Sequence, residues 1–363
     1  MLKYLMSIFI SIVTFNSEAY IEPCLESVFA LAGIEKSQIL IIDNASSDRT
    51  REILNRYQQN KSVEVIFNNN NLGFCAAQNM GASLFLNSPQ DYFLMLNPDV
   101  VLDETCLIKM VDTFKLSASI GLVTPRLLRG DSKLKPVFPQ IIDATGMKLL
   151  SSWRHLDRGS EQLADNNYTE SEYVFGGTGA CLMLSRKFIS DVVIDSRAFD
   201  SAIFKVHPEL EAGMSERVQL LDEAFFAFRE DAELAFRANY LGWKTVYQSE
   251  AVAVHKRSVL PENRGSLPAF INRLGVRNRF LLQILHFRIS QGFLPCFFGL
   301  ILRNSLVVLA ALFIERSSLK AFEDLQILFR RALFRRRLII KKSKPLSSDF
   351  EWFKIDSKNI NET

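Results

Sequence analysis

Asp99 is the first residue whose position suggests chemistry, because it comes directly after a strongly apolar stretch. Tyr92–Leu96 is a run of large apolar residues, and Asn97 and Pro98 end it. Such a run stopped by a proline predicts a strand buried on both faces. Asp99 should then lie on a loop at the carboxyl end of a central strand, where open α/β sheets bind ligands. A solvated turn is the alternative, since aspartate is a common turn residue.

Glu230 and Asp231 form a second candidate site at the start of a segment with helical spacing that ends at Gly242. Two interpretations are open for this pair. The helix dipole stabilises carboxylates at this position, so the pair could simply cap the helix. A carboxylate can also accept the proton of an attacking hydroxyl, so the pair could act as a general base.

Alternating strands and helices would position these residues. An alternation of this kind predicts a mostly parallel sheet with helices on both faces. No GxGxxG or GxxxxGK[ST] motif occurs, so a dinucleotide site or a P-loop is unsupported. The glycines at 176, 177 and 179 allow close backbone approach or a turn into a strand. The expected strands are Ser7–Phe15, Gln38–Ile42, Val63–Phe67, Tyr92–Leu96 and Lys244–Val254, and the expected helices are about 23–32, 49–59, 74–86, 104–116 and 230–241.

The composition is that of an ordinary globular protein, with 363 residues, 48% hydrophobic residues and a net charge of +3. The five cysteines are scattered and form no CxxC motif, so neither a disulfide framework nor a zinc site is indicated. The apolar start, Met1–Phe15, lacks a small-residue cleavage site, and we interpret it as the first strand rather than a signal peptide.

Six segments, in order along residues 7–256, resemble bacterial family 2 glycosyltransferases of the GT-A fold, specifically the branch containing rhamnosyltransferases. Each segment is short, but six in the family's order make the resemblance specific. It implies a Rossmann-like GT-A catalytic domain over residues 1–262. The segments are IVTFNSE (12–18), IIDNASSDRT (41–50), NNLGFCAAQNMG (70–81), FLMLNPDV (93–100), GGTGACLMLSR (176–186) and DEAFFAFREDAEL (222–234).

The resemblance also implies roles for single residues. Asp43 would bind the base or ribose of a nucleotide-sugar donor, and Asp99 would bind Mg²⁺ or Mn²⁺ with His255 as a second contact. Asp231 matches the catalytic base, with Glu230 beside it. The full set implied to bind the donor is Thr14, Asn16, Asp43, Asn44, Ser46, Asn71, Gly73, Asn97 and Asp99.

This chemistry is physically reasonable. A divalent ion neutralises a leaving diphosphate, and hard oxygen ligands suit that ion. One carboxylate base on the opposite side of the sugar would give inversion at the anomeric carbon. The chain departs from many relatives in having a single acid, Asp99, where they have two. Ser196–Leu220 is a longer insertion than usual and suggests a mobile lid. The histidines at 155, 207 and 286 belong to no motif and are interpreted as structural or solvated.

Residues 263–345 predict a helical region that associates with a membrane, followed by a polar tail over 346–363. Phe293–Ile314 is apolar but carries Arg303 at its centre, which would cost about 2.5–3.5 kcal/mol in a spanning helix. Glu315–Lys344 carries ten Lys and Arg against three acids. Its part Leu319–Ile340 predicts a basic amphipathic helix suited to an anionic leaflet. A helix packed on the catalytic domain or on a dimer partner is the alternative.

The sequence thus predicts an inverting, metal-dependent glycosyltransferase, cytoplasmic and peripheral on the inner face of the cell membrane. We expect it to move L-rhamnose from dTDP-L-rhamnose onto a lipid-linked glycan acceptor in O-antigen, lipopolysaccharide or capsule biosynthesis. Galactofuranose or an N-acetylhexosamine from a UDP-sugar remain open, as does a non-catalytic membrane-associated scaffold of the same fold. No nucleic-acid partner is expected, since the basic run lacks a binding module. The sequence does not indicate the oligomeric state.

Overall fold

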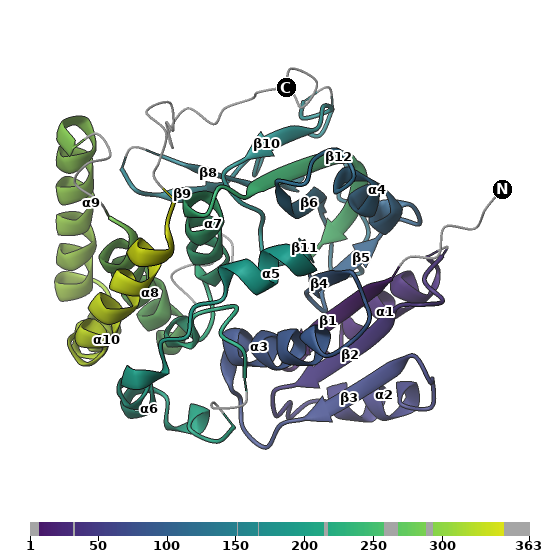
Figure 1. Ribbon diagram of the computed structural model, residues 1–363, viewed down its shortest axis with the longest axis horizontal. Coiled ribbons are helices and arrows are strands. Elements are labelled where there is room, and N and C mark those ends of the chain that lie inside the picture. The colour runs from purple at the N-terminus through teal and green to yellow at the C-terminus, as the bar shows by residue number, and fades with distance from the viewer. Residues whose placement is uncertain are drawn as a thin grey trace.

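A mixed β-sheet with helical layers on both faces forms the protein (Figure 1). The computed structural model describes residues 7–31, 33–150, 152–165, 167–213, 217–257, 268–287 and 293–344, without the side chains of 293–297. The boundary expected at 262/263 and the polar tail expected at 346–363 lie outside these residues.

The sheet runs in the order β10-β12-β6-β11-β4-β1-β2-β3, with β5 paired to β12 and β7 paired to β6. The five expected strands are all present, with ends that differ by no more than one residue. The strands are β1 (Ile8–Thr14), β2 (Gln38–Asp43), β3 (Val63–Phe67), β4 (Tyr92–Leu96), β5 (Val100–Leu102), β6 (Ile120–Arg129), β7 (Ile142–Ala144), β10 (Glu172–Val174), β11 (Cys181–Ser185) and β12 (Lys244–His255), and a separate pair is β8 (Met147–Leu149) with β9 (His155–Asp157).

The parallel part of the sheet comprises the pairs β1–β2, β2–β3, β1–β4 and β6–β12. β11 runs antiparallel between β4 and β6, and β12 is antiparallel to both β5 and β10. The mixed sheet fits the expected GT-A class. The chain enters β11 from β10 through the glycine-rich segment 176–179, without a crossover helix.

Two apolar cores lie on opposite faces of the sheet. One core lies between α1, α2 and α4 and one face of β1, β2 and β4. The other core lies between α3, α5 and α7 and the opposite face of the sheet. The helices on these two faces are α1 (Ile21–Phe29), α2 (Thr50–Tyr57), α3 (Gly73–Leu86), α4 (Cys106–Thr113), α5 (Arg186–Val192) and α7 (Glu230–Tyr240).

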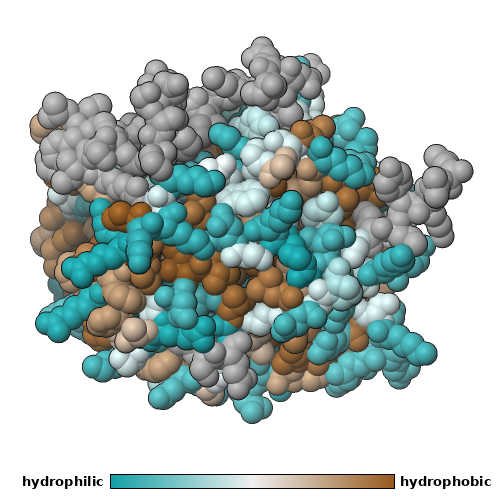
Figure 2. Space-filling model, viewed as in Figure 1, coloured by the Kyte–Doolittle hydropathy of each residue, from teal (hydrophilic) through white to brown (hydrophobic). Residues whose placement is uncertain are grey.

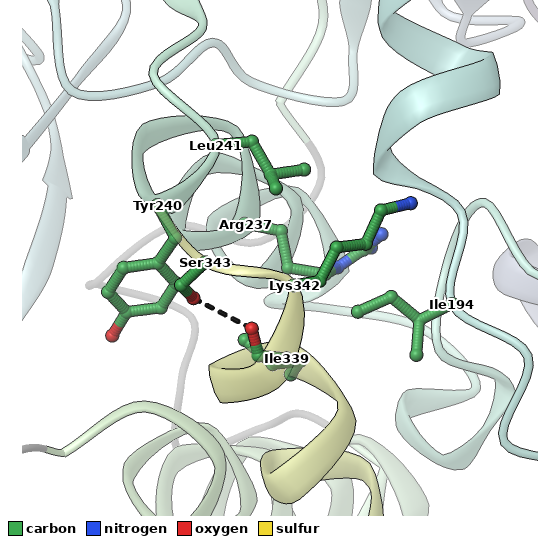
Figure 3. A pocket seen from close by; sticks show the side chains of 7 residues that line it. All are labelled: Ile194, Arg237, Tyr240, Leu241, Ile339, Lys342 and Ser343. Carbon is green, nitrogen blue, oxygen red and sulfur yellow. Dashed lines mark hydrogen bonds between the residues drawn. The ribbon is translucent and has the colours of Figure 1, made fainter. Parts of the chain in front are cut away.

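Three further helices, α8 (Ala269–His286), α9 (Phe293–Phe313) and α10 (Lys320–Lys342), form an outer layer on the side of the molecule away from β2 and β3 (Figure 1). A short 3₁₀ turn, η6 (Arg316–Leu319), joins α9 to α10. α8 and α10 share in the core that contains α3 and α7. The end of α10 packs on α7, and the gap between them leaves no room for a water molecule, so it is not a ligand pocket (Figure 3).

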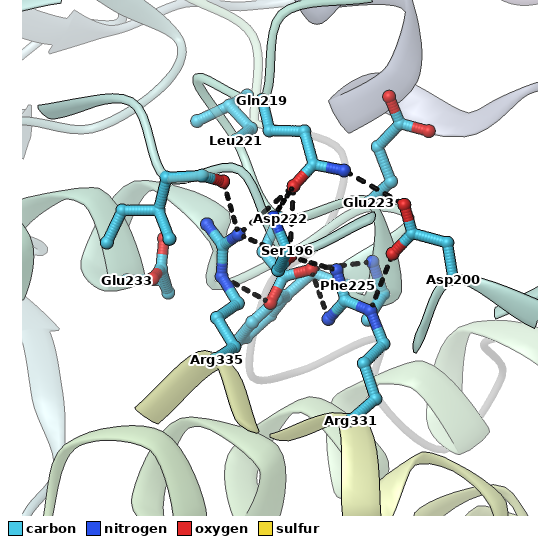
Figure 4. A network of polar contacts seen from close by, with 12 residues as sticks. Ser196, Asp200, Gln219, Leu221, Asp222, Glu223, Phe225, Glu233, Arg331 and Arg335 are labelled. Carbon is cyan, nitrogen blue, oxygen red and sulfur yellow. Dashed lines mark hydrogen bonds and ion pairs between the residues drawn. The ribbon is translucent and has the colours of Figure 1, made fainter. Parts of the chain in front are cut away.

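The insertion 196–220 is packed rather than a mobile lid in its described residues, so that expectation is wrong. It contains η1 (Arg197–Phe199), α6 (Ser201–Val206) and η2 (Pro208–Leu210), and Ile203 and Leu210 are fully buried. The reason is a polar network with α10 (Figure 4). Arg331 lies 3.1 Å from Asp200, and Arg335 donates to Ser196.

The prediction of an exposed basic face on α10 is therefore wrong for Arg331 and Arg335, which are 1% and 0% exposed. Both arginines pair with Asp222, at 2.8 and 3.0 Å. A buried carboxylate needs a cation, and Asp222 obtains two of them from α10. The alternative of a helix packed on the catalytic domain thus holds for this face, while Arg330 and Arg337 remain exposed.

Candidate active site

The nucleotide end of the candidate site forms where β1 and β2 end side by side. Their register pairs Thr14 with Asp43, and the Thr14 hydroxyl donates to the Asp43 carboxylate at 3.0 Å. Ser46 donates to the same carboxylate, and Arg51 lies 2.6 Å from its other oxygen. Asp43 is fully buried, so these donors offset the cost of its charge. Arg51 was missed from the sequence, although a buried acid at a strand end calls for a nearby cation.

Four further predicted residues lie close to the ends of β1 and β2. Asn16 adopts a left-handed conformation and accepts from the Ser47 amide at 2.8 Å. The Asn44 side chain donates to the Gly73 carbonyl at 3.0 Å, and Asn71 accepts from the Gly73 amide at 2.9 Å. The structure therefore brings the predicted residues of the first three motifs together at one edge of the sheet.

Asp99 and His255 meet because β5 pairs with the end of β12. The register places Val100 opposite His255, and Asp99 Oδ1 lies 3.5 Å from His255 Nε2. His255 Nδ1 lies 2.8 Å from Asp143, a fully buried acid that the sequence did not single out. Burial alone would lower the pKa of His255, but the hydrogen bond to Asp143 and the nearby Asp99 carboxylate outweigh it and raise the pKa to about 9.

Asp143 is held by two arginines as well as by His255. Arg257 lies 2.9 Å and Arg129 3.2 Å from its carboxylate. Burial acts to raise the pKa of Asp143, but His255 and these arginines hold it below its ordinary value. Asp143 thus remains charged and fixes the orientation of the His255 ring.

The donor set suits a divalent ion held jointly with a diphosphate, with the ion displacing the proton that the raised pKa leaves on His255 at neutral pH. Asp99 Oδ1 is buried and has no hydrogen-bond partner, and His255 Nε2 faces it. Among the described residues no group of three or more His, Cys, Asp or Glu is placed to hold a metal. A site with two protein ligands fits Mg²⁺ or Mn²⁺, because these ions complete their shell with substrate phosphates and water.

Asp231 lies at the start of α7, against the glycine-rich segment. Its carboxylate accepts from the Gly179 amide at 3.1 Å. Burial raises the pKa of Asp231 to about 6, while the Gly179 hydrogen bond partly opposes the rise. Burial, and then the Asp231 charge, raise the pKa of Glu230 as well. Glu230 Oε2 is buried without a hydrogen-bond partner. Two adjacent carboxylates with raised pKa values are typical of acid–base sites.

The segment 176–180 joins the two sides of the site. The Asn97 amide donates to the Ala180 carbonyl at 2.8 Å, next to the residue that binds Asp231. Gly176 and Gly177 are needed for this packing. A Cβ at Gly176 would lie 2.4 Å from that of Ala235 on α7, and one at Gly177 would lie 2.5 Å from Leu182. The prediction of close backbone approach is confirmed at these two glycines.

Comparisons with known proteins bear on this arrangement. A model of the family "Glycosyl transferase family 2" matches residues 9–192, just over half of the chain. Poly-beta-1,6-N-acetyl-D-glucosamine synthase of Staphylococcus aureus (strain COL) is 31% identical over 122 residues, which cover 33% of this chain and 29% of that protein. The synthase of Staphylococcus epidermidis is 30% identical with the same coverage. The chain therefore spans less than a third of the length of these curated relatives.

Solved structures share the fold at low identity. GalNAc-T7 with UDP, GalNAc and Mn²⁺ is 14% identical, covers 80% of this chain and 50% of its own, and has a TM-score of 0.57. S. aureus TarS is also 14% identical, covers 96% of this chain and 54% of its own, and has a TM-score of 0.51. The narrower likeness to rhamnosyltransferases is not shown by these proteins. The family model and the fold agree, and this chain belongs to glycosyl transferase family 2.

Proposed function

We propose that this chain is an inverting, metal-dependent glycosyltransferase that uses a UDP-activated N-acetylhexosamine. The position of Asp231 is the main observation that supports this reaction class. Its partly buried carboxylate accepts a hydrogen bond from the Gly179 amide, and the carbonyl of the neighbouring Ala180 accepts one from Asn97, on the loop that carries Asp99. A base with a raised pKa and a candidate diphosphate site thus adjoin the same short segment of backbone.

The chain's residues divide the reaction between them. Asp43 and its neighbours would bind the nucleoside, and Asp99 with His255 would hold a divalent ion. Such an ion, when bound, supplies positive charge that stabilises the leaving diphosphate. Asp231 would remove the proton of the acceptor hydroxyl as its oxygen bonds to the anomeric carbon and the bond to UDP breaks. A single displacement of this kind inverts the anomeric configuration.

The choice of donor rests on the curated relatives, which are N-acetylglucosamine synthases by name. They support the N-acetylhexosamine alternative better than the L-rhamnose that the sequence suggested. The deciding experiment incubates purified full-length protein with UDP-GlcNAc, UDP-GalNAc, UDP-galactofuranose and dTDP-L-rhamnose, and measures nucleotide release with Mn²⁺ or with EDTA. We expect slow, metal-dependent release of UDP from an N-acetylhexosamine donor.

Other outcomes of this screen have definite meanings. Release from dTDP-L-rhamnose alone would contradict the proposed donor but keep the reaction class. Absence of binding to every donor would favour the non-catalytic scaffold. Release that is equally fast with EDTA would remove the metal from the proposal. Asp231→Asn is the matched control, because it should bind the donor without releasing the nucleotide.

The acceptor proposed here is a lipid-linked glycan at the inner face of the membrane, and the surface of α9 supports it. Asn304, near the centre of α9, faces the protein, since its side chain exchanges hydrogen bonds with Gln283 and Arg279 of α8. The other side of α9 is apolar and exposed, and brown residues mark its position at the edge of the molecule (Figure 2). The exposed apolar residues are Phe298, Ile301, Leu302, Leu306, Leu309, Leu312 and Phe313.

The charge next to this face suits an anionic leaflet. Within 315–344, seven Lys and Arg residues are exposed, whereas Glu323 is the one exposed acid in that segment. Apolar insertion together with basic residues is the combination that gives stable peripheral attachment. Of the described helices, none alone is long and apolar enough to cross a bilayer, although Phe298–Phe313 and Arg316–Lys342 pass that test as a pair bent by 119°. Co-sedimentation with anionic vesicles tests the attachment.

A further inference from the structure

The loop 225–229, directly before the acids of α7, has an unusual backbone. Phe226, Phe228 and Arg229 have φ angles of 64°, 69° and 71°. Side chains other than glycine are uncommon in this left-handed region, and aromatic ones are genuine outliers there. Three such residues among four persist only where the surroundings impose the conformation. The loop sets the entry of α7, and thereby the position of Asp231.

Asn278 of α8 holds this loop. Its side chain is fully buried, and the two N–H groups of Nδ2 are shared among the carbonyls of Phe225, Ala227 and Phe228, which lie 2.9, 2.7 and 2.8 Å from Nδ2. One amide group therefore gathers three carbonyl oxygens that the left-handed turns direct to the same point. A carboxylate of the same size could not do so, because it has no donor.

Arg277 fixes which end of the Asn278 amide faces the loop. Its Nε donates to Asn278 Oδ1 at 2.9 Å, and its Nη2 donates to the Phe225 carbonyl at 2.8 Å. Arg277 is itself fully buried and donates through Nη1 to His207 at 2.7 Å. Burial and the nearby arginines lower the pKa of His207 to about 3, so its ring is neutral and can accept this bond.

The opposite side of the loop contacts the segment 70–81, which is proposed to bind the nucleotide. The Cys75 amide donates to the Phe226 carbonyl at 3.0 Å. Gly73 leaves room for the Phe226 ring, because a Cβ there would lie 2.7 Å from it. His207, from the insertion, stacks on the same ring with centroids 4.5 Å apart and an interplanar angle of 17°. The loop is thus clamped between the donor side of the site and α8.

We propose that Asn278, oriented by Arg277, is a positioning residue that holds loop 225–229 in its left-handed conformation and thereby sets Asp231 against the Gly179 amide. This inference rests on the proposed role of Asp231 as base. It assigns to α8, outside the six sequence motifs, a direct part in building the site.

The test compares Asn278→Asp with Gln283→Ala, a matched change on the same helix whose side chain contacts Asn304 instead of the loop. We expect Asn278→Asp to keep its affinity for the donor and to lose on the order of 10- to 100-fold in kcat, because small misplacements of reacting groups cost that much. Its pH–rate profile should also shift, since the surroundings of Asp231 change. Gln283→Ala should change neither quantity.

A double variant separates the two proposals. If Asn278 acts through Asp231, Asn278→Asp should cause little further loss in an Asp231→Asn background, whereas an undiminished loss would overturn the inference. Near-normal turnover of Asp231→Asn alone would instead overturn the role of Asp231. Should Asn278→Asp not fold, Arg277→Lys removes the orienting Nε donor and keeps the charge. An unchanged kcat and pH profile in that variant would also overturn the inference.

Discussion

The two sides of the candidate site are held together by different kinds of contact. On the donor side, Thr14 and Asp43 meet because two adjacent parallel strands end together. On the side of the base, loop 225–229 is held by Asn278, a residue about fifty positions further along the chain. The nucleotide end of the donor side is therefore built from strand ends, and the side of Asp231 from buried polar side chains of a distant helical layer.

The C-terminal helices contact the side of the candidate site that contains Asp231. Arg331 and Arg335 cross from α10 to Asp222, just before the loop (Figure 4). Every contact of this kind places a charge in a buried position, where it is stable only with its partner. The base side should therefore be the more sensitive to loss of a single distant side chain.

The largest effect is expected from Asp231→Asn. Removing a general base typically costs about 10²- to 10⁴-fold in rate, and donor binding should stay nearly intact because the donor contacts lie on the other side. Steady-state kinetics together with titration of the nucleotide sugar measure the two quantities separately. Near-normal turnover would shift the role to Glu230, for which Glu230→Gln is the matched comparison.

Arg331→Leu should give the next largest effect, on stability. The change removes the cation that Asp200 has at 3.1 Å and leaves Asp222 with Arg335 alone. Breaking a buried pair costs about 3–5 kcal/mol of unfolding free energy. Arg330→Leu is the control, because Arg330 is exposed and surface changes usually stay within about 0.5 kcal/mol. Equal unfolding midpoints in urea for both variants would show that α10 is a dispensable appendage.

The contrast between the two sides also shows what the sequence could predict. The runs of β1, β2, β3 and β4 are mostly apolar, with only Ser11 and Glu64 inside them, and polar residues close each run. Both the strands and the edge that they share were therefore predictable. Asp99 and His255 were expected together from the family resemblance, and the structure places them 3.5 Å apart. Their roles as metal ligands stay predictions.

Contacts between distant buried polar residues were not predictable in the same way. Asp143 lies in a stretch without strong periodicity, and only the fold brings it to His255, 112 positions away. Arg331 and Arg335 lie in a basic amphipathic pattern that is typical of membrane surfaces. Whether such an arginine faces lipid or a buried aspartate depends on the tertiary structure, and the pattern contains no information about that.

Asp143→Asn tests the donor side through its metal. Loss of a carboxylate that orients a metal-binding histidine typically lowers metal affinity about 10- to 100-fold. We expect weaker Mn²⁺ binding in the presence of UDP, measured by electron paramagnetic resonance, with the fold intact. Asp157→Asn is the control, because Asp157 contacts Arg257 but not His255. Unchanged Mn²⁺ affinity in Asp143→Asn would exclude His255 as a ligand that Asp143 orients.

The pH dependence of kcat probes the base directly. Because the pKa of Asp231 is raised to about 6, the active carboxylate form is lost as the pH falls through 6, and kcat should drop about tenfold for each further pH unit. An ordinary aspartate would keep its activity down to about pH 4. Because the folded-state pKa of this carboxyl is raised, its protonation stabilises the folded state relative to the charged form. The loss of rate should therefore occur without any unfolding caused by the protonation of Asp231. A profile that is flat down to pH 5 would contradict the assignment.

The smallest effect is expected on the outer layer, from Leu306→Glu on the exposed face of α9. Leu306 is 57% exposed, so the substitution should leave the unfolding free energy nearly unchanged. The substitution places a charge on the face of α9 that is proposed to contact lipid acyl chains, and it removes apolar area from that face. Binding to anionic vesicles should therefore weaken about tenfold. Leu116→Glu is the matched control, since Leu116 is 60% exposed beside α4, far from α9 in the sequence. Equal vesicle binding by both variants and the unchanged chain would show that α9 does not face lipid. If only Leu306→Glu loses binding, the distant layer that clamps the base side of the site is also the layer that meets the membrane.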